Sequence, residues 1–266
     1  MFLRSSNDVG RFPSITTAVS ATTDIYYHEQ PQALGNSMWT AGPEGVSIYS
    51  PDGATVIKKM SPTDLGCPSP EGCFFFALAS DGHSHVWATS LHAFPHRVDV
   101  FSIDSGEYVG GVGVCNTPLD LDYVPAREEL WVRCAEPNNK EVDMESGHIS
   151  VISTGSLSAS NEEVRLSDDR QYGRSVFHSS LGNYGYATAH ATNVLYKVDM
   201  AQRSVASNFT LPEEVHSSYD LTYSSANKHL YIRSRVCCSC GFEGADAATC
   251  GRSPGVPTII QVGPSA

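Results

Sequence analysis

Apolar and polar residues alternate in two stretches of the chain that lie one hundred residues apart and closely resemble each other. Residues 118–134 read PLDLDYVPAREELWVRC and residues 218–234 read SYDLTYSSANKHLYIRS, with six of seventeen aligned positions identical and no gap. In the first copy, Leu119, Leu121 and Tyr123 fall on one face, and this period of two predicts a strand. A short polar turn and a second alternating run follow. Each copy is therefore predicted to be a β-hairpin.

The same outline recurs along the chain at intervals of about fifty residues. Strand pairs are predicted at 45–60, 97–114, 148–166 and 193–211, with a last strand at 258–262, and hairpins precede them at 74–89, 118–134, 175–189 and 218–234. The landmark residues of the third strands are Ile48, Val100, Val151, Tyr196 and Ile260, at spacings of 52, 51, 45 and 64. Four short strands repeated in this way are typical of the blades of a β-propeller.

We therefore expect an all-β chain, a β-propeller of four-stranded antiparallel blades with about five or six blades present and a possible incomplete ring. A β-sandwich is the rival, but it would not sustain four-strand self-similarity over several units. Residues 1–37 are predicted as an irregular segment or a partial blade, and the propeller as 38–266. The predicted blades are approximately 38–66, 74–114, 118–166, 175–211 and 218–262, with a Cys-rich insertion at 237–250.

Charge and hydropathy exclude some partners. The chain has 266 residues and a net charge of −12, with 17 Lys and Arg against 29 Asp and Glu, and no basic run. We expect no nucleic-acid partner, because phosphate contacts require clustered Lys and Arg. We also expect no membrane insertion, because no run of 18 apolar residues occurs.

Eight cysteines favour an oxidising compartment, since their number is even and several are close in sequence. Cys115 and Cys134 flank the first hairpin, and in the second copy both are replaced together, by Val215 and Ser234, as expected of a disulfide. The alternative is a pair of buried thiols. Cys67 and Cys73 enclose a loop that a disulfide would lock. The last four cysteines favour disulfides over a zinc site, because their spacing does not suit paired zinc ligands: Cys237, Cys238, Cys240 and Cys250.

The N-terminal residues do not agree with an oxidising compartment. MFLRSSNDVGRFPS lacks the apolar core of a secretory signal. Either the protein is not secreted, or its signal lies upstream of this sequence or was lost from the gene model. We expect the second, an extracellular or secreted protein. Asn208, within Asn208-Phe209-Thr210, matches the N-glycosylation acceptor pattern and agrees with that setting.

Two groups of residues are candidate metal ligands. His83, His85, His92 and His96 are the densest histidine cluster and could hold copper, zinc or iron. All four belong to one predicted blade, so solvated histidines are the favoured alternative. Asp120 and Asp220 recur in the two hairpin copies and could hold calcium. The favoured alternative is that they bind backbone amides of a neighbouring blade, since every blade meets the same packing problem.

The phrases DLDYVPAREELWV and DLTYSSANKHLYI resemble the repeat of YVTN-type and NHL-type propellers over most of residues 40–262. The hairpin bracketed by Cys115 and Cys134, with Pro118 and Trp131-Val132 inside it, is also similar to one in the C-terminal propeller region of secreted follistatin-like glycoproteins. The second resemblance implies an extracellular binding module without catalysis.

The sequence contains no G-x-S-x-G, no P-loop and no H-E-x-x-H motif. We expect a non-catalytic extracellular propeller without a cofactor that binds a protein or glycan partner through loops on one face. The first alternative is a propeller-type metal-dependent hydrolase or lyase, similar to a lactonase, with axial calcium or another divalent metal. An intracellular scaffold is the second.

Overall fold

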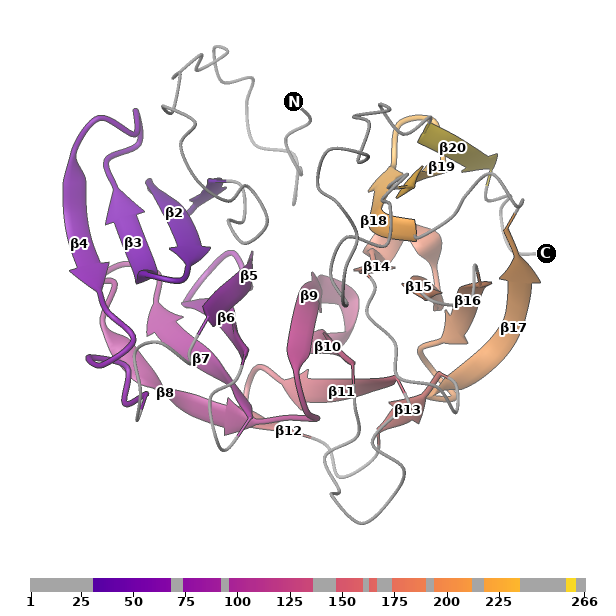
Figure 1. Ribbon diagram of the computed structural model, residues 1–266, viewed down its shortest axis with the longest axis horizontal. Coiled ribbons are helices and arrows are strands. Elements are labelled where there is room, and N and C mark those ends of the chain that lie inside the picture. Colours follow the sequence, from indigo (N-terminus) through magenta and orange to yellow (C-terminus); the bar gives the residue numbers. More distant parts are fainter. Residues whose placement is uncertain are drawn as a thin grey trace, which may run out of the picture. The chain divides into compact units, whose positions relative to one another are not determined.

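The computed structural model of the protein describes residues 31–67, 74–91, 96–135, 147–159, 163–166, 174–189, 194–211, 218–234 and 257–261. These ranges form five antiparallel sheets, A to E in chain order, in which the neighbouring strands are mostly consecutive in sequence (Figure 1). This up-and-down order is that of propeller blades. The helical elements in these ranges are the 3-10 turns η2 (Pro125–Arg127) and η3 (Ser179–Leu181). No helix among them is long and apolar enough to cross a membrane.

The chain divides into two compact units, Met1–Gly111 and Val112–Ala266. The first unit holds sheets A and B, and the last residues of β8 continue past the boundary. Sheet A consists of β1 (Gln32–Leu34), β2 (Ser37–Gly42), β3 (Gly45–Tyr49) and β4 (Val56–Met60). Sheet B consists of β5 (Phe74–Ser80), β6 (His85–Leu91), β7 (Arg97–Ser102) and β8 (Tyr108–Gly113).

The second unit holds sheets C, D and E. Sheet C consists of β9 (Pro118–Val124), β10 (Glu129–Cys134) and β11 (His148–Ser153), with β12 (Ser158–Ala159) and β13 (Val164–Arg165) both paired to β11. Sheet D consists of β14 (Ser175–Phe177), β15 (Tyr184–Ala189), β16 (Val194–Asp199) and β17 (Ser204–Thr210). The described strands of sheet E are β18 (Ser218–Ser224), β19 (His229–Ser234) and β20 (Pro257–Gln261).

One detail differs from the predicted boundaries. Sheet A begins at Gln32, inside the segment expected to be irregular or a partial blade, because Gln32–Leu34 pairs with β2. Within the strand pair predicted at 148–166, the fourth strand of sheet C consists of the two short segments β12 and β13. The two hairpin copies occupy equivalent places, since both β9–β10 and β18–β19 are the first two strands of a sheet.

Local sequence explains the tight turns. Gly45 begins β3 at φ +104°, and a Cβ at this position would lie 1.9 Å from the carbonyl oxygen of Met60. Only glycine allows the backbone of β4 to approach so closely. The turns after β3 and β7 contain Gly53 and Gly106, both at positive φ, as the Pro-Asp-Gly and Asp-Ser-Gly sequences predict.

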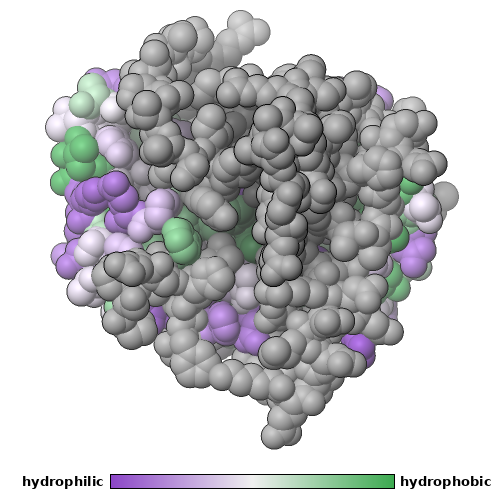
Figure 2. Space-filling model, in the orientation of Figure 1, coloured by the Kyte–Doolittle hydropathy of each residue, from purple (hydrophilic) through white to green (hydrophobic). Residues whose placement is uncertain are grey.

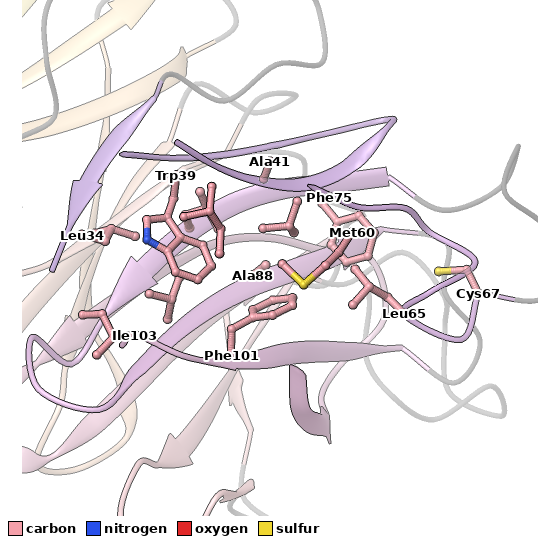
Figure 3. Packing of buried hydrophobic residues seen from close by; sticks show 14 residues of the cluster. Leu34, Trp39, Ala41, Met60, Leu65, Cys67, Phe75, Ala88, Phe101 and Ile103 are labelled. Atoms are coloured by element: carbon pink, nitrogen blue, oxygen red, sulfur yellow. The ribbon is translucent and has the colours of Figure 1, made fainter. Parts of the chain in front are cut away.

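The core of the first unit lies between sheets A and B. Trp39 and Phe75 are fully buried there, and the rings of Trp39 and Phe101 lie 6.1 Å apart (Figure 3). Met60 and Leu65 extend the cluster toward Cys67, while Leu34 and Ile103 close its other side (Figure 3). Every second residue of a strand points to the same face, so the apolar residues at alternate positions lie together in one layer.

The second unit has two cores of this kind. One lies between sheets C and D and includes Trp131, Phe177, Tyr196 and Val198. The other joins sheets D and E through Tyr186, Leu195, Leu221, Leu230 and Ile232. Sheet D contributes to both, because Ala187 and Tyr186 are neighbours in sequence and point to its opposite faces.

Candidate functional site

The two ends of the sheets in the second unit carry different connections. Consecutive strands are antiparallel, so connections alternate between the ends. One end, the short-turn end, carries the turns 125–128, 154–157, 178–183, 200–203 and 225–228. The other end carries 135–147, 166–174, 190–193, 211–217 and 235–256; all of these except 190–193 are longer than any turn at the first end, so we name it the long-connection end. Long, varied connections mounted on a sheet scaffold are where binding residues concentrate.

A hydrogen-bonded seam joins sheets C and D at the long-connection end. The carboxylate of Asp120 on β9 accepts a hydrogen bond from the backbone N–H of Ser175 on β14, at 3.0 Å. Asp122 accepts one from the N–H of Phe177, at 3.1 Å. Asp120 thus has the structural role expected of it, binding a neighbouring blade's amide. The side chain of its counterpart Asp220 lies outside the described residues.

Arg174 adds a charged contact to this seam. Its guanidinium lies 3.3 Å from Oδ1 of Asp120 and also donates to the carbonyl oxygen of Leu119, at 3.4 Å. Its own backbone pairs with Thr188 of β15, which donates its N–H to the Arg174 carbonyl at 2.8 Å. Arg174 therefore belongs to sheet D by its backbone and to sheet C by its side chain.

A second arginine is enclosed beneath the seam. Arg133 on β10 pairs in register with Asp120 and is fully buried. Its guanidinium donates to the carbonyl oxygens of Cys134 and, at 3.3 Å, of His148. Burial lowers the pKa of Arg133 to about 10, against the opposing effect of Tyr196 and Asp120. The side chain is therefore still charged at neutral pH, with Asp120 as a nearby counter-charge.

The residues at the roots of the long connections are tied together. Cys115 and Cys134 form a disulfide with Cα atoms 5.8 Å apart, and both are fully buried. The N–H of Cys115 donates to the Ser150 hydroxyl at 2.9 Å, and that hydroxyl donates to Glu163 at 3.2 Å. Cys134 precedes the connection 135–147 and Ser150 lies just after it, so these bonds attach both ends of the connection to Cys115.

At the short-turn end the same two sheets meet through further polar contacts. Glu129 accepts hydrogen bonds from the Trp131 indole at 3.1 Å and from Arg203 of sheet D at 3.0 Å. Arg127 donates to Asn183 at 3.2 Å. Between the two ends lies the stack of Trp131 on Phe177, with ring centroids 4.8 Å apart.

The expected disulfide cysteines are placed in part. Besides the Cys115–Cys134 bond, Cys67 is disulfide-bonded, and its expected partner Cys73 lies outside the described residues. The whole cluster Cys237, Cys238, Cys240 and Cys250 also lies outside them.

The histidine cluster is only partly described. His83 lies in the turn before β6 rather than in the strand, because the carboxylate of Asp81 accepts the backbone N–H groups of His83, Ser84 and His85. The His85 ring lies 3.1 Å from the same carboxylate, His96 directly precedes β7, and His92 lies outside the described residues. Within the described part of the chain, no three His, Cys, Asp or Glu side chains form a metal-binding group.

A polar cluster in sheet B was not anticipated from the sequence. Asp99 is fully buried and accepts hydrogen bonds from Arg97 at 2.8 Å and from the Tyr108 hydroxyl at 3.0 Å. Burial raises the pKa of Asp99 to about 6, although Arg97 and Tyr108 oppose the shift. The signal available in the sequence was the spacing of Arg97 and Asp99, which places both on one strand face.

Comparison with known proteins identifies the fold. No protein-family model and no curated protein matches the chain. Among solved structures, Kuenenia stuttgartiensis hydrazine synthase matches at TM-score 0.59 and 16% identity, covering 85% of this chain and 62% of that one. The β-propeller domain of Myceliophteria thermophila Cps50 (Swd1) matches at TM-score 0.55 and 12% identity, covering 81% and 65%. This chain thus spans less than two thirds of either.

A protein of unknown function from Bacteroides caccae matches at TM-score 0.50 and 12% identity, covering 75% of this chain and 67% of that one. At such identities the likeness shows the fold alone. Together with the four-stranded meanders, it shows that the chain is an all-β protein built from β-propeller blades.

Proposed function

We propose that the protein is an extracellular binding module that engages a protein or glycan partner through the connections at the long-connection end of its blades. Propeller blades serve generally as scaffolds for binding loops. The single observation that supports this end is the seam beneath it, where Asp120 and Arg174 join sheets C and D and the buried Arg133 donates to carbonyl oxygens on both sides of the connection 135–147.

A fixed base favours binding by lowering the cost of ordering a partner-facing surface. The connection 135–147 begins beside Cys134 and ends at His148, and the connection 166–174 ends at Arg174. The chemistry of the seam therefore constrains where these two connections start and finish. The fully buried disulfide supports the extracellular setting, because such bonds persist in oxidising compartments.

The proposal is tested by replacing one end at a time. In one variant, residues 136–146 are replaced by a Gly-Ser sequence of equal length; in the matched control, the turn 225–228 is treated in the same way. Both variants and the original chain are applied to a glycan array and to a panel of extracellular protein domains. We expect the original chain to bind a member of one set, the first variant to bind it at least tenfold more weakly, and the control to bind it unchanged.

Equal binding by both variants would contradict the use of this end. A chain recovered with all eight cysteines as free thiols, shown by alkylation and mass spectrometry without reduction, would contradict the extracellular setting.

A further inference from the structure

The large hydrophobic side chains that are exposed in the described residues all lie on fourth strands. They are Val56 and Ile57 on β4, Tyr108 and Val109 on β8, and Phe209 on β17. Figure 2 shows hydrophobic surface where Figure 1 places β4. Each of these strands is the last in its sheet and has one hydrogen-bonded neighbour among the described strands. Such edges are templates for pairing with another chain.

Two of these edges carry features that discourage pairing. In β4, Ile57 is followed by Lys58 and Lys59, and charged residues, lysine above all, protect sheet edges. In β8, Tyr108 and Val109 are followed by Gly110 and Gly111, and glycine weakens a strand. Both edges therefore carry a protective feature in their own sequence.

The edge of β17 has neither feature. Its sequence SVASNFT contains no charge, no proline and no glycine, and six of its seven residues are exposed. The large apolar residue of this strand, Phe209, is 49% exposed. β13 lies near β17 without pairing with it. This strand does contain Asn208-Phe209-Thr210, the single N-x-Ser/Thr sequence in the chain.

We propose that Asn208 carries an N-linked glycan and that this glycan covers the exposed edge of β17. Asn208 and Thr210 are both exposed, so the folded strand has room for the sugar. A glycan is bulky and strongly hydrated, and at Asn208 it would extend from the face of β17 opposite to Phe209, beside the unpaired edge of the strand. The inference rests on the proposed extracellular setting, because the modification belongs to the secretory route.

In this reaction the oligosaccharide is transferred to Asn208 from a lipid-pyrophosphate-linked donor, which the secretory route supplies. The amide nitrogen of Asn208 forms a bond to the anomeric carbon of the first sugar. The bond between that carbon and the pyrophosphate oxygen breaks, and the lipid pyrophosphate leaves as the amide loses one proton to the transferring enzyme's base.

The test of occupancy uses the full chain with an added secretion signal in N-glycosylating eukaryotic cells. Peptide N-glycosidase treatment in H₂¹⁸O followed by mass spectrometry is expected to convert Asn208 to ¹⁸O-labelled Asp in most molecules. Thr210→Ala should abolish the label, and the matched control Thr210→Ser should keep it. If the chain is retained, the same measurement is made on the microsomal fraction. Unlabelled Asn208 in folded, disulfide-bonded protein would overturn the proposal.

Whether the glycan prevents association through the edge of β17 is tested by measuring the mass of the chain in solution. Light scattering should show the glycosylated chain as a monomer, and the Thr210→Ala chain should at least double its weight-average mass as concentration rises. Adding Phe209→Lys to Thr210→Ala should return it to the monomer. An unchanged mass in Thr210→Ala would show that the glycan does not protect the edge. Neither result depends on the replacement of residues 136–146, so the proposed function can fail while the glycan stands, or the reverse.

Discussion

The junction between sheets A and B and the junction between sheets C and D perform the same packing task with different chemistry. Between A and B, a layer of apolar side chains such as Trp39, Phe75 and Phe101 forms the core. Between C and D, a comparable apolar core is bordered by directional polar contacts, with Asp120 at one end and Glu129 at the other.

The difference shows what each kind of contact specifies. Apolar burial stabilises roughly in proportion to area and tolerates small shifts. A carboxylate that accepts a hydrogen bond from one particular amide tolerates few shifts in position, because an unsatisfied hydrogen-bonding group in the interior costs about 1–3 kcal/mol. The polar junction lies where the connection 135–147 begins and ends and where the connection 166–174 ends, and there the proposed binding surface needs a fixed base.

The largest effect is expected from breaking the polar junction. Asp120→Ala should lower the free energy of unfolding by roughly 3–5 kcal/mol, because it removes the ion-pair partner of Arg174, a counter-charge of the buried Arg133 and the acceptor of the Ser175 amide. Asp122→Ala, which removes a single acceptor from a partly exposed position, should cost roughly 1–3 kcal/mol. Urea unfolding measures both. Equal, small losses would show that the seam does not hold the junction.

Next in size is a pH effect from the buried carboxyl of the first unit. The pKa of Asp99 is raised from 3.8 to about 6, so the folded state holds a proton that the unfolded state has released. The contribution of Asp99 to stability should therefore fall by about 3 kcal/mol as pH rises from about 4 to about 6, and level off above that. Asp99→Asn should remove this slope. Unfolding free energies at several pH values test it, and identical slopes in both chains would contradict the assignment.

A smaller effect is expected where the aromatic stack meets the backbone. Gly185 lies opposite Phe177 in the β14–β15 pair, and a Cβ at Gly185 would approach that ring to 1.9 Å. Gly185→Ala should therefore displace Phe177 from Trp131 and cost roughly 1–3 kcal/mol. A near-ultraviolet circular dichroism change should accompany the loss. Gly113→Ala is the matched control, since nothing lies within 4 Å of its added Cβ.

The smallest effect is expected in the apolar junction. Leu34→Met conserves volume in a non-directional core, so it should cost less than about 1.5 kcal/mol. The melting temperature measures it. A loss as large as that of Asp120→Ala would mean that the A–B core is as specific as the C–D junction.

The repeat of hydrophobic pattern predicts the sheets well, because strand alternation and turn residues are local properties. The hairpins at 118–134 and 218–234 and the turns at Gly53 and Gly106 are of this kind. Even the role of Asp120 follows, since a residue that recurs in a repeat meets the same neighbour in each copy.

The contacts across the junction could not be predicted in the same way. Arg174 lies 54 residues from Asp120, and Arg203 lies 74 residues from Glu129. Neither arginine has a counterpart in a repeated motif, and many arginines would fit such a role equally well. The close fit of Gly185 to Phe177 depends on register, which alternation fixes only to within two residues.

Carboxylates of sheet C hold amides of sheet D, and amide hydrogen exchange of Ser175 and Phe177 reports on these two hydrogen bonds. We predict that both amides are protected in the original chain, that Asp120→Ala exposes Ser175, and that Asp122→Ala exposes Phe177, while the Thr188 amide, bonded to the Arg174 carbonyl, exchanges as before in Asp122→Ala. Unchanged protection of Ser175 and Phe177 in folded variants would show that these carboxylates do not hold the amides.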